Sequence, residues 1–258
     1  MVKEGKYIYC IIGTNQDRYF GSIGVGGKGD EVLTIGYDDL GMGMVVSNHP
    51  LTQIDVNREN MLAHEKVIEK VMEEFDSVLP VRYGTIASNA DEIRNLLDRR
   101  YREFKNLLRD MNHKIELGVK GLWENMDIVF KEIIEENKKI KKAKEEIKNL
   151  EEKISIQSKI EIGKMVDDAL QKKKEKETQC IIDVLQKAYV DIKRNKTVSD
   201  EMFMNASFLV DRGREKEFDN IMDDLNEEYK NRVKFKYTGP LPVFNFTNIV
   251  IYPEAWEK

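Results

Sequence analysis

The chain has 258 residues and a mass of 30.1 kDa, a length that allows one or two domains with a sizeable core. Hydrophobic residues make up 41% of it, too many for a wholly disordered protein. The 42 basic and 47 acidic residues give a net charge of −5, which argues against a protein that holds a long nucleic acid by charge alone. Two cysteines make no disulfide framework, and no apolar run reaches the ~18 residues of a membrane-spanning helix. We therefore expect a cytoplasmic, helix-rich protein.

The first part of the chain alternates between strand and helix patterns. Runs rich in β-branched and aromatic residues predict strands, and apolar residues spaced by three and four predict helices. Ser88 and Asn89 supply the N-cap chemistry of a helix start. In chain order, we predict strands at 7–12, 31–37 and 42–47, with a loop at 13–30, then a helix at 57–75, a strand at 81–87, a helix from 90 to 111 and a strand at 115–119. This mixed order predicts an α+β sheet with helices on one face.

The middle of the chain, from Lys131 to Glu177, lacks proline and contains a single glycine. Isoleucines recur there every seven residues, as in a coiled-coil seam of about three heptads: Ile133, Ile140, Ile147 and Ile154. The spacing predicts a long helix that packs along one stripe. Its partner is either a second chain, as in a coiled-coil dimer, or another helix of the same chain. A second helix is expected from 175 to 193.

The last part of the chain returns to the mixed pattern. We predict a strand at 202–211, a helix at 215–229, a strand at 233–238 and a turn at 239–242 that leads into an apolar, aromatic tail. The predicted fold class is α+β, with two ferredoxin-like sheet-plus-helix domains. The N-terminal domain covers residues 1–113. The C-terminal domain covers residues 114–258, with a long coiled-coil-like helical insertion at 124–195 and a tail at 239–258.

Three glycines, Gly24, Gly26 and Gly29, match the G-x-G-x-x-G pattern of dinucleotide-binding loops. Such a loop must open a helix, because the N-terminus of that helix holds the phosphates. Here the glycines are followed by a strand pattern at residues 31–35. A loop between strands is therefore the favoured interpretation, and no cofactor is expected.

The sequence carries no pattern of a catalytic or metal site. His64-Glu65 begins like a zinc-protease helix, but the position of the second histidine is occupied by Ile68. A histidine that pairs with nearby acids at the helix surface is therefore the preferred interpretation. Cys10 and Cys180 both lie among aliphatic residues, so each is expected to be a buried small hydrophobic side chain. We expect no enzyme and no small-molecule substrate.

Arg82 lies inside a predicted strand, in the segment Leu79-Pro80-Val81-Arg82-Tyr83-Gly84-Thr85. A charge there needs solvent or a partner, because an unpaired buried charge is costly. A structural ion pair with a helix acid is the preferred interpretation, and contact with a partner's carboxylate is the functional alternative. The lysines of the middle segment alternate with acids, which is typical of a solvated helix face.

Five phrases of the sequence are specific when they are taken together in their order and spacing. They are Tyr7-Ile8-Tyr9-Cys10-Ile11-Ile12, His64-Glu65-Lys66-Val67-Ile68-Glu69, the Leu79–Thr85 segment, Asn205-Ala206-Ser207-Phe208-Leu209-Val210, and Tyr237-Thr238-Gly239-Pro240-Leu241-Pro242-Val243-Phe244-Asn245-Phe246. With them the chain resembles the GvpF/GvpL family of gas vesicle proteins, from Tyr7 to Tyr252. It departs from the family pattern in having Tyr83 in place of a phenylalanine.

The resemblance implies two α+β domains and a non-enzymatic role as an accessory protein in gas vesicle assembly. It also implies location at the gas vesicle, binding to the major shell subunit and association with the shell as a minor component. We place the partner contact on the N-terminal domain, where strand edges can accept another chain. The residues expected to make it are Leu79, Pro80, Arg82, Tyr83 and Gly84. Neither nucleic acid nor membrane is expected as a partner.

Two other functions are consistent with the residues. The heptads at 133–154 are compatible with a coiled-coil scaffold that bridges other gas vesicle accessory proteins. The glycine loop is compatible with a nucleotide-binding enzyme, although its context argues against this.

Overall fold

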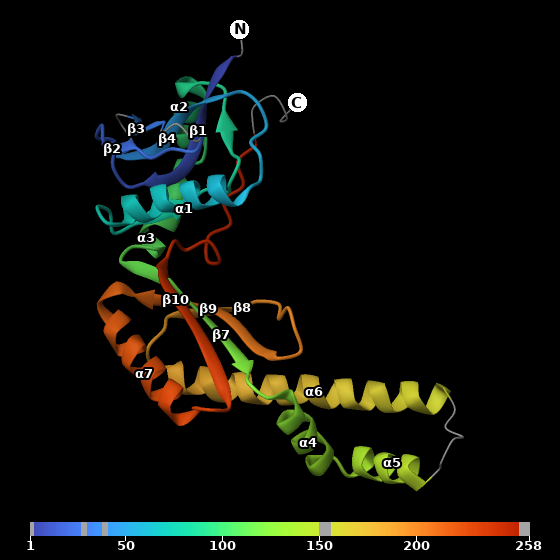
Figure 1. The fold of residues 1–258 in the computed structure, drawn as a ribbon. Coiled ribbons are helices and arrows are strands. Elements are labelled where there is room, and N and C mark those ends of the chain that lie inside the picture. Colours follow the sequence, from blue (N-terminus) through green and yellow to red (C-terminus); the bar gives the residue numbers. More distant parts are fainter. Residues whose placement is uncertain (1–2, 27–29, 38–40, 150–155, 253–258) are drawn as a thin grey trace. The chain divides into compact units, whose positions relative to one another are not determined.

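The computed structural model describes residues 3–26, 30–37, 41–149 and 156–252 (Figure 1). The chain divides into two compact units: unit 1 takes residues 1–116, 209–213 and 239–258, and unit 2 takes residues 117–208 and 214–238. Both units combine sheet and helix, so the α+β class is confirmed, while the ferredoxin-like arrangement of two domains stays a prediction. The tail was expected in the second domain, but its contacts place it in unit 1.

Unit 1 is built on a six-stranded sheet in the order β2-β3-β4-β1-β5, with β6 also paired to β1. The central strand β1 is antiparallel to β4, β5 and β6, and β3 is antiparallel to β2 and β4. All six residues of the apolar run 7–12 are fully buried, as a strand with neighbours on both edges and packing on both faces requires. The strands are β1 (Glu4–Ile12), β2 (Tyr19–Ser22), β3 (Glu31–Tyr37), β4 (Met42–Pro50), β5 (Val78–Pro80) and β6 (Ile86–Ala87).

Helices cover both faces of this sheet, where the sequence predicted one. Side chains alternate along a strand, so Tyr7 and Ile8 point to opposite faces. Tyr7 contacts His64 of the first helix, whereas Ile8 belongs to a core cluster with Leu97 and Phe104 of the next two. These helices are α1 (Arg58–Met72), α2 (Ala90–Arg99) and α3 (Tyr101–Asp110).

The helix starts follow the predicted chemistry, and two of the predicted boundaries are wrong. Asn89 caps α2 by accepting a hydrogen bond from the backbone N–H of Glu92 at 2.9 Å. The helix predicted at 90–111 is interrupted at Arg100, whose backbone is not helical (φ −105°, ψ 19°). The strand predicted at 81–87 is a strand only at 86–87, in β6, because residues 81–85 form a turn between β5, which ends at Pro80, and β6. Gly84 permits this turn, since its φ of +84° suits glycine alone.

In its described residues, unit 2 contains a four-stranded sheet in the order β10-β7-β9-β8 and four α-helices. The strand predicted at 202–211 and the helix predicted at 215–229 are confirmed almost to the residue. The strands are β7 (Lys114–Trp123), β8 (Asp191–Arg194), β9 (Met202–Asp211) and β10 (Val233–Leu241). The helices are α4 (Met126–Glu136), α5 (Lys138–Asn149), α6 (Ile156–Leu185) and α7 (Glu215–Glu228), with a short 3-10 turn at Arg212–Arg214.

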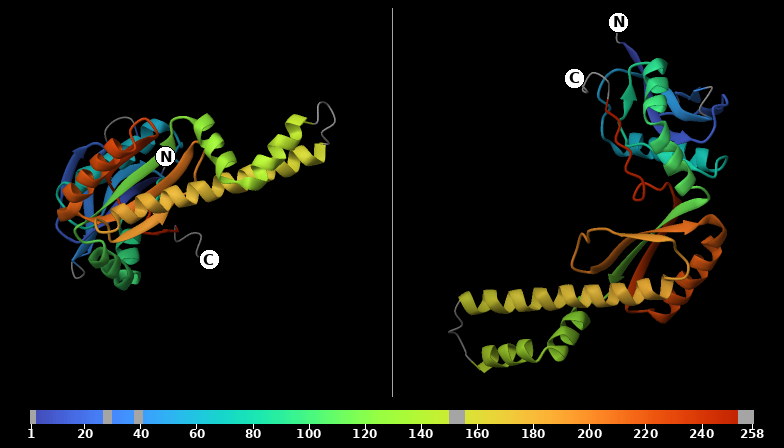
Figure 2. Two further views of the ribbon diagram at one scale, coloured as in Figure 1. Left: turned by 90° about the horizontal axis from the view of Figure 1, so that it is seen from below. Right: turned by 180° about the vertical axis from the view of Figure 1, so that it is seen from behind.

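The long helix predicted in the middle of the chain is not continuous. It breaks at Asn137, whose extended backbone (φ −115°, ψ 98°) separates α4 from α5. Both α4 and α5 pack against α6, which turns back alongside them (Figure 2). Ile133 and Ile140 of the heptad series are buried within the chain itself, so the intramolecular alternative holds for them. The side chain of Ile147 and the whole of Ile154 lie outside the described residues.

Candidate partner-binding pocket

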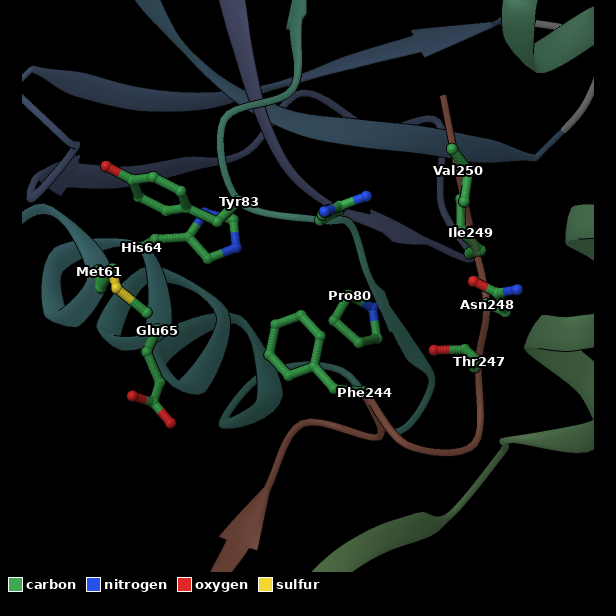
Figure 3. Close-up of a pocket in the computed structure, with 11 residues that line it drawn as sticks. Met61, His64, Glu65, Pro80, Tyr83, Phe244, Thr247, Asn248, Ile249 and Val250 are labelled. Carbon is green, nitrogen blue, oxygen red and sulfur yellow. The ribbon is translucent and has the colours of Figure 1, made fainter. Parts of the chain in front are cut away.

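A pocket of about 510 Å³ lies in unit 1, and three separate parts of the chain line it (Figure 3). Helix α1 contributes one wall with Met61, His64 and Glu65, which share a helix face because they are three and four residues apart. The end of β5 and the turn that follows contribute Pro80, Arg82 and Tyr83, and the tail contributes Phe244, Thr247, Asn248, Ile249 and Val250.

The tail wall is fixed by polar and apolar contacts within unit 1. The carboxylate of Glu116 accepts hydrogen bonds from the backbone N–H of Asn245 (2.9 Å) and from its side-chain amide (2.5 Å). Ile249 is only 4% exposed and belongs to the core cluster. The Arg100 guanidinium donates to the carbonyl of Val250 at 2.7 Å. The tail is therefore packed into unit 1 as one wall of the pocket.

Hydrogen bonds fix the turn that forms the second wall of the pocket. The backbone N–H of Gly84 donates to the Tyr7 hydroxyl at 3.1 Å, and the Tyr83 hydroxyl donates to the carbonyl of Asp55 at 2.7 Å. The Thr85 hydroxyl closes the turn by donating to the carbonyl of Arg82 at 2.7 Å. These bonds fix the backbone on either side of Arg82.

His64 lies at the base of the pocket, where both of its ring nitrogens are engaged. Nε2 lies 3.2 Å from the carbonyl oxygen of Val81, which can only accept, so Nε2 carries the proton. Nδ1 then accepts from the Tyr7 hydroxyl at 2.9 Å. The result is a chain of donors from the N–H of Gly84 through Tyr7 and His64 to Val81. No acid among the described residues pairs with His64, because its ring points into the protein and bonds to Tyr7 and Val81.

Aromatic rings surround His64 and keep water from it. The Tyr9 ring stacks on the imidazole with centroids 5.5 Å apart, Tyr83 meets it edge-on at 5.6 Å, and Phe244 lies 6.4 Å away. Burial disfavours the charged imidazolium and lowers the pKa of His64 from 6.5 to about 4. Burial also raises the pKa of Tyr9 to about 12. At neutral pH this group is therefore uncharged.

The charged groups of the pocket lie at its rim. Arg82 is exposed, and no carboxylate of the described residues lies within ion-pair distance of its guanidinium, so the preferred ion-pair interpretation is wrong. Phe244 and Met61 are 40% and 50% exposed beside it. The pocket is mostly apolar, with the Glu65 carboxylate on its α1 wall and the Arg82 guanidinium on its turn wall. It suits an apolar side chain whose neighbouring carboxylate lies toward Arg82 and away from Glu65.

The five predicted contact residues separate into two groups. Pro80, Arg82 and Tyr83 line the pocket. Leu79 is fully buried in the core cluster of unit 1, and Gly84 shapes the turn. Their role in partner binding stays a prediction. Sequence reasoning missed the contributions of α1 and of the tail, since nothing local indicates that residues 61–65 and 244–250 meet.

The remaining sequence candidates have structural explanations. Cys10 is buried as expected, but Cys180 is exposed. His113 lies 3.3 Å from the Asp76 carboxylate. The glycine-loop pattern leads into β3 at Glu31 and not into a helix.

Within the described ranges, no group of three His, Cys, Asp or Glu side chains is arranged to hold a metal ion. In the same residues, no helix has the length and apolar character needed to cross a membrane.

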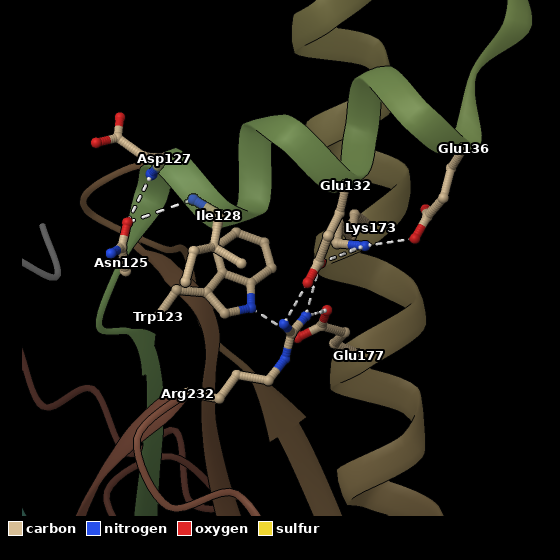
Figure 4. A network of polar contacts seen from close by, with 9 residues as sticks. All are labelled: Trp123, Asn125, Asp127, Ile128, Glu132, Glu136, Lys173, Glu177 and Arg232. Atoms are coloured by element: carbon tan, nitrogen blue, oxygen red, sulfur yellow. Dashed lines mark hydrogen bonds and ion pairs between the residues drawn. The ribbon is translucent and has the colours of Figure 1, made fainter.

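Unit 2 contains a polar network that joins β7, α4 and α6 through Arg232, which lies in the turn before β10 (Figure 4). The Arg232 guanidinium donates to both oxygens of Glu132 on α4 (2.6 and 3.0 Å) and to Glu177 on α6 (2.8 Å). Trp123 donates its indole N–H to Glu177 at 2.6 Å, and the Lys173 ammonium lies 3.0 Å from Glu132. The hydrogen bond from Arg232 lowers the pKa of Glu132 to about 2. The network holds α4 against α6.

Comparison with known proteins supports one family. The profile of the family described as gas vesicle synthesis protein GvpL/GvpF matches residues 5–248. Gas vesicle protein F1 of Halobacterium salinarum is 28% identical over 253 residues, covering 97% of this chain and 96% of that protein. Gas vesicle protein F of Microcystis aeruginosa is 22% identical over 196 residues, covering 75% and 79%.

Solved structures share the fold. The crystal structure of GvpF from an Anabaena species superposes with a TM-score of 0.82 at 20% identity, covering 96% of this chain and all of that one. The GvpF structure from Microcystis aeruginosa gives a TM-score of 0.79 at 20% identity, covering 95% and 99%. Because the family profile spans nearly the whole sequence, the chain belongs to the GvpL/GvpF family of gas vesicle synthesis proteins.

Proposed function

We propose that this chain is a cytoplasmic accessory protein of gas vesicle assembly that binds the major shell subunit and remains with the shell as a minor component. Membership of the GvpL/GvpF family supports the gas vesicle role. The pocket of unit 1 supports the binding role. Its contact with the subunit is proposed to run along α1, the turn at 80–84 and the tail.

The observation that carries the proposal is the composition of this pocket. Exposed Met61 and Phe244 offer apolar surface at the rim, and burying such surface favours binding by about 25 cal/mol per Å². Arg82 offers a cation with no carboxylate of the described residues as its partner. A side chain of the subunit that enters the pocket meets apolar walls, while an adjacent carboxylate meets the guanidinium.

A binding role also agrees with the state of His64. A general base needs a ring nitrogen that is free to take a proton and a pKa near the working pH. In His64, Tyr7 and Val81 occupy the two nitrogens, and the pKa of about 4 lies well below neutrality. His64 thus serves to position the α1 wall against β1 and the turn.

The test is affinity capture of the major shell subunit of the same host by the full-length chain after co-expression. Full length is required because a piece ending at residue 113 lacks the tail wall and the buried Ile249. The informative variants are Arg82→Glu and Phe244→Ser. Matched controls are Arg109→Glu and Tyr19→Ala, which change an exposed arginine and an exposed aromatic of unit 1 that do not line this pocket.

We expect each pocket variant to lower retention of the subunit by about tenfold or more, which corresponds to ~1.4 kcal/mol, and the controls to retain it fully. Full retention of the shell subunit by both pocket variants would show that the contact lies elsewhere on the chain. Failure of the unmodified chain to retain the subunit would refute the binding role itself and favour the alternative of a scaffold that bridges other accessory proteins.

A further inference from the structure

Helix α5 carries a dense basic face. Lys138, Lys139, Lys141 and Lys142 occupy adjoining positions at its N-terminal end, and all four are exposed. Ile140, on the opposite side of the helix, is buried. None of these lysines forms an ion pair with a described residue. Lysines three and four residues apart repel one another, so the face costs the helix stability.

Helix α7 carries an acidic face of similar size. Asp223, Asp224, Glu227 and Glu228 lie in its C-terminal half, and all four are exposed. Among them, the described ion pairs involve only Glu227, which lies 3.5 Å from Lys230. Spacings of four residues place 223 beside 227 and 224 beside 228, so these carboxylates also repel one another.

On each helix, the exposed charges have the sign that the helix dipole disfavours at that end. A helix N-terminus is stabilised by acids and a C-terminus by bases. The first turn of α5 has no acid and is rich in lysine, and the last turn of α7 has no base and ends in Glu227 and Glu228. Among the described residues these charges have one compensating ion pair, between Glu227 and Lys230, and charges that oppose a local rule in this way are expected where function requires them.

The two faces cannot satisfy each other within one molecule. Both helices belong to unit 2 and pack on α6. α5 is joined to the start of α6 through residues 150–155, whereas Arg214, just before α7, donates to the carbonyl of Lys187 beyond the end of α6. Figures 1 and 2 show α5 and α7 at different ends of this helix of 30 residues, which is about 45 Å long.

We propose that the basic face of α5 and the acidic face of α7 are the two halves of a head-to-tail contact between copies of this chain. Four lysines on one helix then meet four carboxylates on a helix of another copy, and both unfavourable helix ends are neutralised. The contact joins two different surfaces, so each added copy leaves one basic and one acidic face free. Such a contact builds open rows, or rings where the rotation between copies closes.

A second copy fits the basic face better than other anions do. There is no arginine between residues 110 and 193, although arginine is the usual choice for phosphate recognition. The sequence of α5 has no aromatic residue for stacking on bases, and its Ile140 is buried and not available to enter a membrane. A matching acidic helix face is present on the chain itself.

The test is sedimentation velocity of the full-length chain over a range of concentrations. At ionic strength of about 10 mM, charges act over ~30 Å, and the sedimentation coefficient should rise with concentration. Near 1 M the range falls to ~3 Å, and the chain should sediment as a monomer of 30.1 kDa. A sedimentation coefficient independent of concentration at low salt would overturn the proposal.

Two neutralised variants test the surfaces separately. One is K138Q/K139Q/K141Q/K142Q, and the other is D223N/D224N/E227Q/E228Q. Each keeps one working face, so each alone should remain monomeric at low salt. Their equimolar mixture should form dimers and nothing larger, because only one contact can form. The control K234Q/K236Q, which neutralises two exposed lysines of β10, should assemble like the unmodified chain.

Folding of each variant is checked by its unfolding curve, and no loss is expected because the replaced charges repel one another. Assembly by either neutralised variant alone, or an equimolar mixture that stays monomeric, would overturn the proposal. Loss of assembly in the K234Q/K236Q control would also overturn the proposal, since assembly would then depend on the net charge of the chain and not on these two faces. Capture of the shell subunit is a separate readout and should be unchanged in all of these variants.

Discussion

His64 makes the stability of unit 1 depend on pH in a way that can be calculated. Replacing it with glutamine keeps an N–H donor for the Val81 carbonyl and removes the titrating ring. In the folded chain burial lowers the pKa of His64 to about 4, whereas in the unfolded chain it is 6.5. The unfolded chain therefore takes up a proton first, so the contribution is complete above pH 6.5 and is lost as the pH falls toward 4.

The size of the loss follows from the two pKa values. Each pKa unit is worth about 1.4 kcal/mol, so the whole difference is about 3 kcal/mol, of which about 2 kcal/mol is already lost at pH 5. The assay is urea unfolding of the unmodified chain and of His64→Gln at several pH values between 7 and 4. Carboxylates titrate equally in both proteins, so the difference between the two free energies of unfolding isolates the histidine.

We expect the stability of the unmodified chain to fall by about 3 kcal/mol more than that of His64→Gln over this range. The variant should be the less stable protein at pH 7, since glutamine fills the aromatic surroundings poorly, and the gap should narrow in acid. Parallel curves for the two proteins would show that His64 is not held neutral by burial, and the description of the pocket base would then be wrong.

Three further changes test the packing. Arg232→Met should lower the free energy of unfolding by about 1 kcal/mol at neutral pH, a figure reduced because the ion pair is partly exposed. This loss should shrink as the pH falls from 4.5 toward 2, because Glu132 then takes up its proton. A loss that stays constant with pH would contradict the ion pair. Ile249→Ala should cost about 2–5 kcal/mol in thermal unfolding, and a loss below that range would mean that the tail is not part of the core. Gly121→Ala should cost about 1–3 kcal/mol, because the new methyl group would lie 2.5 Å from the ring of Phe203; unchanged stability would show that this ring can move.

The strands and helices that could be predicted were those with their own local signal. β3 and β9 were predicted to the residue because each is a run of apolar or β-branched residues bounded by turns. β2 was missed because Tyr19–Ser22 contains a glycine and pairs only with β3, at the edge of the sheet. β8 was missed because residues 191–194 follow a helix pattern without a break.

The helical part of unit 2 shows a limit of periodicity. The heptads at Ile133 and Ile140 correctly marked a buried stripe, but they gave no warning of the break at Asn137 between them. A helix pattern is preserved across such a break when the chain resumes in the same register. The network around Arg232, which holds α4 against α6, joins residues as far apart as 132 and 232, which no local pattern can reveal.

The pocket was predicted only in the part that is continuous in sequence. Pro80, Arg82 and Tyr83 were predicted as a contact, and they do line one wall. The pairing of His64 with Tyr7 across 57 positions, and the return of the tail to unit 1, depend on tertiary packing alone. The amphipathic pattern of α1 indicates that one side is buried, but not that a histidine on that side meets a tyrosine.

The return of the tail to unit 1 has a consequence for synthesis on the ribosome. Unit 1 takes residues 1–116, the short segment 209–213 and the tail from residue 239. The last residues of unit 2 therefore precede the tail in the chain. Unit 2 can therefore fold while unit 1 still lacks a core residue and one wall of its pocket. A nascent chain that has not reached residues 244–250 has no complete pocket, because these residues form one of its walls. The order of translation thus delays any capture of a partner through this site until residues 244–250 have been made.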